Sequence, residues 1–261
     1  MPKNQTWGYQ KNCQICGTTN LKNILNLGHQ PIVQEYLRAN ELHEPETRYP
    51  LNLVRCPKCT LVQIDYIAEP SKVFFPDYPY RTGLTNMLIR NFLELADVLE
   101  KKYDLKPKDL IVDIGSNDGT LLKGFKAKGM KVLGIEPTNA AKDANKNGIT
   151  TFQAFFDKAS VSQAKKKFGA AQVITATNVF AHINNVPELM SNVRNLLATD
   201  GIFVSESQYL LDIVTKKEFD TIYHEHLRFY ALKPLQLLFN KYGMSLVDAE
   251  RISAAGGSIR V

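Results

Sequence analysis

The segment LIVDIGSNDGT, residues 110–120, decides the fold of this chain. An apolar run typical of a buried strand leads directly into a turn with glycines at positions 115 and 119. Glycine lets the backbone turn tightly and lets a ligand lie close to the main chain. The spacing is D-x-G-x-x-x-G, whereas dinucleotide-binding turns have G-x-G-x-x-G with a third glycine near the pyrophosphate. The turn therefore favours a nucleoside ligand that lacks a pyrophosphate.

Apolar runs and helical patterns alternate from this segment onward. We expect buried strands in four runs, namely LIVDI (110–114), KVLGIE (131–136), QVITAT (172–177) and GIFVSE (201–206). We expect helices between them, in residues 118–129, 139–148 and 186–197. This alternation predicts an α/β fold with a parallel sheet covered on both faces, whose ligands bind at the carboxyl ends of the strands.

Polar residues follow the predicted strands. Glu136 stands where a carboxylate accepts both hydroxyls of a ribose, and Asp113 stands beneath a ligand's ammonium group. Asn178 would line the same crevice, while His182 either joins it or satisfies a loop carbonyl. The turn and the downstream acid together resemble the S-adenosylmethionine (SAM) site of class I, Rossmann-like methyltransferases. The predicted cofactor-binding residues of this region are Asp113, Gly115, Ser116, Asn117, Asp118, Gly119, Glu136, Pro137 and Asn178.

Four cysteines form two CxxC pairs near the N-terminus, CQIC and CPKC. Four thiolates are the tetrahedral ligand set that a structural zinc ion prefers, and they leave the metal no open position for catalysis. A redox pair and buried unligated cysteines are the alternatives. We expect the histidines between the pairs, His29 and His43, to lie on the surface of this module. The predicted zinc ligands are Cys13, Cys16, Cys56 and Cys59.

The segment FDTIYHEHLRFY, residues 219–230, concentrates two of the five histidines of the chain. His224 and His226 share a face if the segment is extended and diverge if it is helical. A metal site, an acid/base centre and a polar loop without a role all fit, although no third metal ligand with suitable spacing is visible.

Composition narrows the classes of partner. The chain has 261 residues, of which 44% are hydrophobic and 22% charged, as is ordinary for a soluble globular protein. The net charge of +6 permits nucleic-acid binding, but no basic stripe is interleaved with aromatic residues, so we expect no nucleic-acid partner. The N-terminal stretch MPKNQTWGYQ has no apolar signal region, and no run approaches the roughly 20 apolar residues of a membrane span. We therefore predict a cytoplasmic protein without a membrane partner.

The order of motifs resembles that of SAM-dependent sugar C-methyltransferases, which act on nucleotide-linked 4-keto-deoxysugars and carry an N-terminal zinc-binding domain. The matching parts are the two CxxC pairs, FPDYPYRTG, VDIGSNDGTLL, GIEPT, TATNVFAHINN and FDTIYHEHLRFY, which together span essentially the whole chain. The resemblance implies methylation of the carbon next to the ketone, through a base-generated enolate that attacks the methyl group of SAM. A nucleotide-sugar would then be the small-molecule partner.

The same resemblance implies a catalytic pocket lined by two segments. Carried onto this chain, its residues are Tyr78, Tyr80, Tyr223, His224, Glu225 and His226. The resemblance points to His226 as the base, a task that suits the pKa of histidine. Glu225 would orient an imidazole or meet a sugar hydroxyl, Tyr78 and Tyr223 would donate to the enolate oxygen or the sugar, and Tyr80 is grouped with the cofactor.

The predicted domains are a zinc-binding domain in residues 1–75, a SAM-binding methyltransferase domain in 76–248 and the start of a C-terminal domain in 249–261. Members of the family are longer, so the resemblance implies that the C-terminal domain is truncated here and the sugar-nucleotide site incomplete. Two other functions stay open: methylation of oxygen or nitrogen in another small molecule, and a zinc-ribbon and SAM-binding module without full activity. The sequence carries no signal for an oligomeric state.

Overall fold

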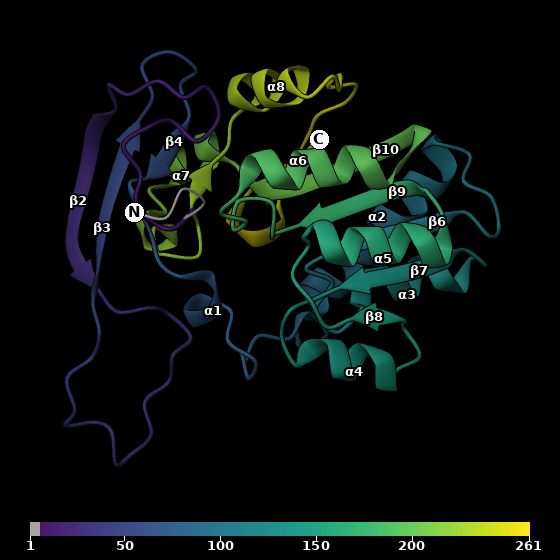
Figure 1. The fold of residues 1–261 in the computed structure, drawn as a ribbon, viewed down its shortest axis with the longest axis horizontal. Coiled ribbons are helices and arrows are strands. Elements are labelled where there is room, and N and C mark those ends of the chain that lie inside the picture. Colours follow the sequence, from purple (N-terminus) through teal and green to yellow (C-terminus); the bar gives the residue numbers. More distant parts are fainter. Residues whose placement is uncertain (1–5) are drawn as a thin grey trace. The chain divides into compact units, whose positions relative to one another are not determined.

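The computed structural model describes residues 6–261, which divide into two compact units (Figure 1). The cysteine unit comprises residues 6–75 together with residues 181–186 and 207–261. The sheet unit comprises residues 76–180 and 187–206. Residues 1–5, part of the stretch in which we predicted no signal region, lie outside the described residues. Both units are assembled from separate segments, whereas the three predicted domain ranges are contiguous and remain predictions.

The sheet unit is built on five parallel strands in the order β10-β9-β6-β7-β8. Their bounds are Leu110–Ile114 for β6, Lys131–Ile135 for β7, Thr151–Phe152 for β8, Ala171–Thr177 for β9 and Leu197–Gln208 for β10. β6 comes first in the chain yet lies between β7 and β9, so the strand order reverses beside it. Such a reversal opens a crevice at the carboxyl ends of the two strands, where ligands of doubly wound sheets bind. The predicted parallel α/β sheet is confirmed.

Helices alternate with these strands and supply the core of the unit. Their bounds are Asn86–Lys102 for α2, Thr120–Ala127 for α3, Ala140–Lys146 for α4, Lys158–Phe168 for α5 and Val186–Leu196 for α6, and a short 3₁₀ turn, η1, spans Thr82–Leu84. Phe92 and Leu95 of α2 and Phe125 of α3 pack with Ile111 and Val173 of the central strands. In residues 6–261 no helix combines the length and the apolar character needed to span a bilayer.

The cysteine unit contains an antiparallel sheet in the order β11-β4-β3-β2. Its strands are Lys22–Gln30 for β2, Tyr49–Arg55 for β3, Val62–Ile64 for β4 and Arg228–Phe229 for β11. The remaining elements are β1 (Gly8–Tyr9), β5 (Tyr66–Ile67), α1 (Pro70–Val73), α7 (Leu210–Lys216), η2 (Phe219–Thr221), α8 (Leu232–Lys241), β12 (Glu250–Ile252), η3 (Ala254–Gly256) and β13 (Ser258–Arg260). Because β11 pairs with β4, the residues that follow Y-H-E-H return to the sheet beside the CPKC loop.

A capping box starts α5, the helix that leads into β9. The Asp157 carboxylate accepts a hydrogen bond from Ser160 N at 2.8 Å, and Ser160 Oγ accepts one from Asp157 N at 3.1 Å. The two bonds satisfy N–H groups that have no partner within a helix.

We predict that Asp157→Ala lowers the free energy of unfolding of the sheet unit by about 1 kcal/mol, because the cap is lost. Asp157→Asn keeps a side-chain acceptor and should cost less. Urea unfolding followed by circular dichroism measures both variants. Equal stability of the alanine variant and the parent chain would contradict the importance of this cap.

Candidate active site

The glycine turn after β6 needs glycine at both positions. Gly115 and Gly119 have φ of +65° and +78°, in the left-handed region that residues with a Cβ rarely adopt. A Cβ on Gly115 would lie 2.6 Å from Val179 Cγ2, and one on Gly119 would lie 2.9 Å from Ile149 Cγ2. Gly115 N donates to the carbonyl of Ile135 at 2.8 Å. The turn is therefore fixed at the carboxyl ends of β6 and β7.

Asp113 is a buried carboxyl group on β6. It is 2% exposed and accepts a hydrogen bond from Thr175 Oγ1, on the neighbouring strand β9, at 2.6 Å. Burial raises the pKa of Asp113 to about 7, with the Thr175 bond opposing that rise and the carboxylate of Glu136 adding to it. A cationic group bound nearby would favour the ionised form. The residue thus fits a ligand that carries an ammonium group.

Glu136 directly follows β7 and already accepts three hydrogen bonds. Its Oε2 accepts from Asn117 N at 3.0 Å, and its Oε1 accepts from Thr138 N at 2.9 Å and Thr138 Oγ1 at 2.7 Å. A carboxylate offers about four lone-pair positions. One ribose hydroxyl can therefore bind without displacing a partner, and a second can replace the Thr138 hydroxyl, which is free to rotate. Pro137 lies between Glu136 and Thr138 in the sequence.

The side chains of Asn117 and Asp118 hold the tyrosine-bearing segment against the glycine turn. Asn117 Oδ1 accepts from Thr82 N at 3.0 Å, and its Nδ2 donates to the carbonyl of Tyr80 at 3.1 Å. Asp118 Oδ2 accepts from Gly83 N at 2.8 Å. These side-chain groups therefore bind residues 80–83, and cofactor binding by Asn117 and Asp118 stays a prediction.

The other predicted cofactor residues also belong to the sheet unit. Ser116 Oγ is buried, has no hydrogen-bond partner among the described residues, and occupies the space that a Cβ on Gly134 would need. Asn178 has a φ of +55° and donates its N–H to the carbonyl of Glu206 at 2.7 Å, at the carboxyl end of β9. Tyr80 is 41% exposed. Carboxylates and turns thus converge at the strand-order reversal.

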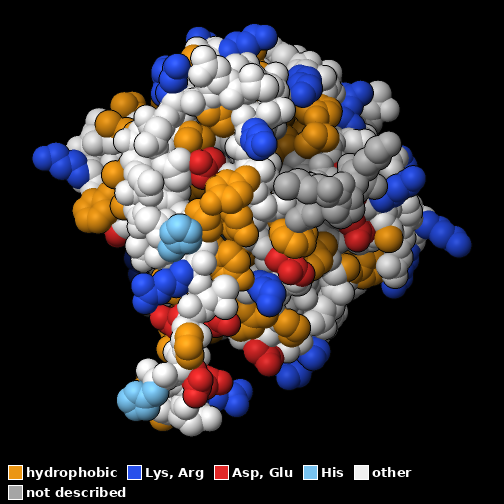
Figure 2. Space-filling view, turned by 60° about the vertical axis from the view of Figure 1, so that its left-hand side comes forward, with side chains coloured by type: hydrophobic (Ala, Val, Ile, Leu, Met, Phe, Trp, Pro, Cys, Tyr) orange, Lys and Arg blue, Asp and Glu red, His pale blue; other side chains and the backbone are white. Residues whose placement is uncertain are grey.

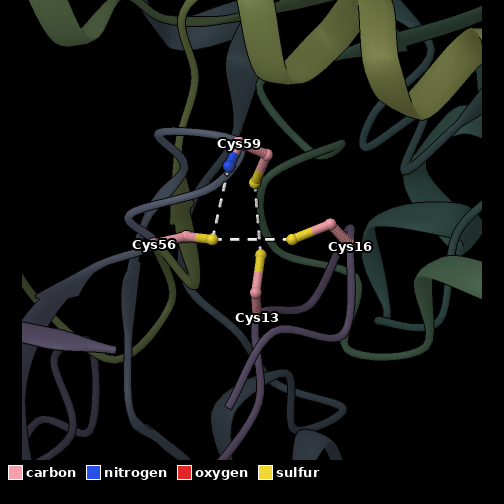
Figure 3. A group of neighbouring side chains, drawn as sticks. All are labelled: Cys13, Cys16, Cys56 and Cys59. Atoms are coloured by element: carbon pink, nitrogen blue, oxygen red, sulfur yellow. Dashed lines mark hydrogen bonds between the residues drawn. The ribbon is translucent and has the colours of Figure 1, made fainter. Parts of the chain in front are cut away.

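The four cysteines converge from the CQIC and CPKC loops (Figure 3). Their sulfur atoms all lie within 4.8 Å of one another, with Cys13 and Cys59 Sγ at 3.4 Å and Cys16 and Cys56 Sγ at 3.5 Å. Tetrahedral zinc with Zn–S bonds of about 2.3 Å sets the sulfurs about 3.8 Å apart, so the cluster fits the ion. Burial raises the pKa of Cys13 to about 11, so a cation is needed to hold its thiolate. Within residues 6–261, the Y-H-E-H side chains form no comparable cluster.

His226 is held as a neutral imidazole inside the cysteine unit. Its Nδ1 lies 2.6 Å from the carbonyl of Thr221, and a carbonyl can only accept, so Nδ1 carries the proton and Nε2 the lone pair. Burial lowers the pKa of His226 to about 4, although the Thr221 bond opposes this. Its ring lies 4.1 Å from that of Tyr223 and 5.0 Å from that of His182, measured between centroids. The imidazole is therefore unprotonated at neutral pH.

His224 points to a different neighbour. It is 1% exposed, its Nε2 lies 3.2 Å from the carbonyl of Pro50 on β3, and its ring packs against Tyr49 at 5.9 Å. Burial lowers the pKa of His224 as well. Glu225, between the two histidines, is also buried. His224 thus fastens the segment to the sheet, while His226 faces residues 181–186.

His182, expected either to line the crevice or to satisfy a loop carbonyl, packs against two aromatic rings. It lies between the ring of Phe74, stacked at 5.8 Å and 13°, and the ring of His226. Burial lowers the pKa of His182, and the neighbouring His226 and Arg228 lower it further. The sequence left the role of His182 undecided and gave no signal for Arg228. The one signal for His182 was its place shortly after β9.

Tyr78 belongs to the sheet unit and is 8% exposed, whereas Tyr223, His224, Glu225 and His226 belong to the cysteine unit. The predicted catalytic residues are therefore divided between the two units. Each unit brings together its own share: the cofactor residues and Tyr78 in one, the zinc ligands and the Y-H-E-H segment in the other.

Two sequence families match the chain. Residues 13–74 match a family described as "Putative zinc binding domain", and residues 83–249 match one described as "Methyltransferase domain". The chain belongs to the methyltransferase family. The C-methyltransferase NovU of Streptomyces niveus is 32% identical to it over 250 residues, or 95% of the chain. The chain spans 59% of the length of that relative.

Solved structures share the fold at low identity. Magnesium protoporphyrin IX methyltransferase (ChlM) from Synechocystis PCC 6803, with bound SAH, superposes with a TM-score of 0.54 and 13% identity over 72% of this chain and 97% of that one. A SAM-dependent methyltransferase from Anabaena variabilis superposes with a TM-score of 0.52 and 15% identity over 73% and 89%. The predictions of a class I methyltransferase fold, a SAM cofactor and a zinc-binding domain are confirmed.

Surface charge is dispersed on the face drawn in Figure 2. Lys and Arg side chains stand among acidic and hydrophobic ones and form no continuous stripe on that face. Large hydrophobic side chains are exposed on the cysteine unit, among them Tyr9, Tyr36 and Leu42. The absence of a nucleic-acid partner stays a prediction.

We expect the purified protein to carry one zinc ion per chain, measurable by elemental analysis. Cys56→Ser should lower the zinc content and the stability of the cysteine unit, because structural zinc contributes on the order of 10 kcal/mol of binding free energy. Lys58→Ala, an exposed change in the same loop, is the control and should keep the metal. Full zinc content in Cys56→Ser would contradict the four-sulfur site.

SAM should bind more tightly as pH rises through the pKa of Asp113, about 7, because the ammonium group of the ligand favours the ionised carboxylate. Titration calorimetry should show an affinity about tenfold higher at pH 8 than at pH 6 for a single group of this pKa. Asp113→Asn should remove the pH dependence and weaken binding. Asp109→Asn, just before the start of β6, should keep it. A flat profile in the parent chain would refute the role of Asp113.

Proposed function

We propose that this protein transfers a methyl group from SAM to the carbon next to the ketone of a nucleotide-linked 4-keto-deoxysugar. The observation that carries the proposal is the buried, neutral His226, whose Nδ1 is bonded to a carbonyl so that Nε2 bears the lone pair. The similarity to a C-methyltransferase over 95% of the chain supports it.

Methylation at carbon differs from methylation at oxygen or nitrogen in its first step. A carbon next to a ketone has no lone pair, so a base must first remove its proton. His226 Nε2 takes that proton, and the electron pair of the C–H bond moves into the enolate. When bound, SAM would supply an electrophilic methyl group for the new carbon–carbon bond, with S-adenosylhomocysteine as the leaving group. The proton then passes from His226 to water.

Neighbouring side chains stabilise the charge that develops on the enolate oxygen. The Tyr223 hydroxyl donates to that oxygen or to the sugar, and its ring already packs against His226. Tyr78, a residue of the sheet unit, is proposed for the same role. Glu225 orients an imidazole or binds a sugar hydroxyl, and His224 holds the segment through Pro50.

The pKa of His226, depressed to about 4, defines the pH range of the base. The imidazole is neutral above this value and is protonated as pH falls through it. Proton removal should therefore persist below pH 6.5, the usual pKa of histidine, and decline only toward pH 4.

Exchange of the sugar proton with solvent deuterium tests the base directly. We expect the protein to make the proton next to the ketone labile, as followed by NMR on a panel of 4-keto-deoxysugar nucleotides. His226→Asn should slow the exchange by roughly 100-fold or more, because general-base catalysis is worth about that much. Exposed His43→Asn is the matched control and should leave the rate unchanged.

Zinc content, which depends on the cysteine unit that holds His43 and His226, reports whether each variant is folded. Exchange at the parental rate in His226→Asn would overturn the assignment of the base. Methyl transfer to a substrate without any exchange would favour the alternative, an oxygen or nitrogen methyltransferase.

A further inference from the structure

Arg228 is one of the most deeply buried side chains of the cysteine unit, with 1% of its surface exposed. Its Nε donates to the hydroxyl of Tyr230 at 2.9 Å. One terminal nitrogen donates to Gln14 Oε1 at 2.5 Å and the other to the carbonyl of Ile183. A guanidinium out of water is tolerated only when acceptors surround it. These acceptors fix Arg228, and Arg228 in turn fixes them.

On one side, Arg228 holds the loop that carries two zinc ligands. Gln14 lies between Cys13 and Cys16 in the CQIC loop. Its backbone N–H donates to Gln63 Oε1 at 2.9 Å, and Gln63 Nε2 donates to the carbonyl of Asn12 at 3.2 Å. Gln63 is also the strand partner of Arg228 in the β4–β11 pair. The CQIC loop and Arg228 therefore belong to one hydrogen-bonded unit.

On the other side, Arg228 holds the loop that carries His182. Leu227 N donates to the carbonyl of Ala181 at 3.1 Å, and Arg228 donates to the carbonyl of Ile183. The two bonds flank His182 in the sequence and bind the backbone before and after it. The rings of His182 and His226 lie 5.0 Å apart, measured between centroids.

We propose that Arg228 is a positioning residue that, together with Gln14, fixes His182 against His226 from the zinc-binding loop. The zinc-binding loop of the cysteine unit then contributes to proton transfer by positioning the two histidine rings, in addition to stabilising the fold of the unit. The part concerning catalysis rests on the function proposed above, whereas the positioning of the histidine rings does not.

Two substitutions separate this role from general stability. Gln14→Ala removes the acceptor on the zinc-binding loop at a half-buried position and leaves all four cysteines in place. Arg228→Lys keeps the charge but cannot reach three acceptors at once. The control is Lys241→Ala, because Lys241 Nζ donates to the carbonyl of Ile15 at 3.1 Å and so binds the same loop from α8.

The decisive experiment records the imidazole NMR signals of the folded, zinc-loaded protein, with His182 and His226 assigned from their glutamine variants. We expect both signals to shift in Gln14→Ala and in Arg228→Lys, and to stay at parental positions in Lys241→Ala. Zinc content and SAM affinity should be unchanged in Gln14→Ala. With a keto-sugar substrate, kcat of Gln14→Ala should fall by roughly 10- to 100-fold with little change in KM, since small misplacements of reacting groups cost this much.

Unshifted signals of His182 and His226 in a folded, zinc-loaded Gln14→Ala protein would overturn the inference, as would a parental kcat. If the signals shift as expected but no keto-sugar nucleotide is methylated by the parent protein, the proposed function fails and the positioning by Arg228 stands.

Discussion

The burial of the Arg228 guanidinium is the constraint on which the cysteine unit depends. A cation removed from water must find acceptors, and it finds them in Gln14, Ile183 and Tyr230, which are far apart in the sequence. The zinc-binding loop, the residues after β9 and the C-terminal segment must therefore meet around one side chain. This requirement explains why the unit is assembled from separate stretches of chain.

In the sheet unit, the predicted cofactor site is shaped mainly by the backbone of the glycine turn. Two glycines in the left-handed region allow the chain to reverse at the end of β6 against Val179 and Ile149. The carboxyl group of Asp113, on β6, and that of Glu136, directly after the neighbouring strand β7, lie near the crevice. Both carboxyl groups are buried. A bound cation would favour the ionised form of Asp113, whose pKa is raised, while Glu136 accepts a hydrogen bond from Asn117 N in the turn. Such a site suits a ligand with an ammonium group and a ribose.

Local patterns were sufficient to predict the sheet and the ligand types. LIVDI with its glycine turn, the alternation that follows it and the paired cysteines each report on short-range geometry, and each is confirmed. β8 has only two residues and α5 is rich in lysine, so neither produced a clear apolar period. Arg228 and the His182–His226 pair escaped prediction because their meaning lies in contacts between distant segments, which no local spacing encodes. The same holds for Asn117 and Asp118, whose side chains bind residues 80–83.

The proposed reaction requires both a SAM site and a neutral histidine base, and the atom that receives the methyl group tests this requirement most directly. The measurement is carbon NMR of the product formed from SAM with a ¹³C-labelled methyl group and a ¹³C-labelled keto-sugar nucleotide. For methylation at carbon we expect a one-bond carbon–carbon coupling between the new methyl group and the ring carbon beside the ketone. A methyl group attached to oxygen or nitrogen, without that coupling, would contradict it.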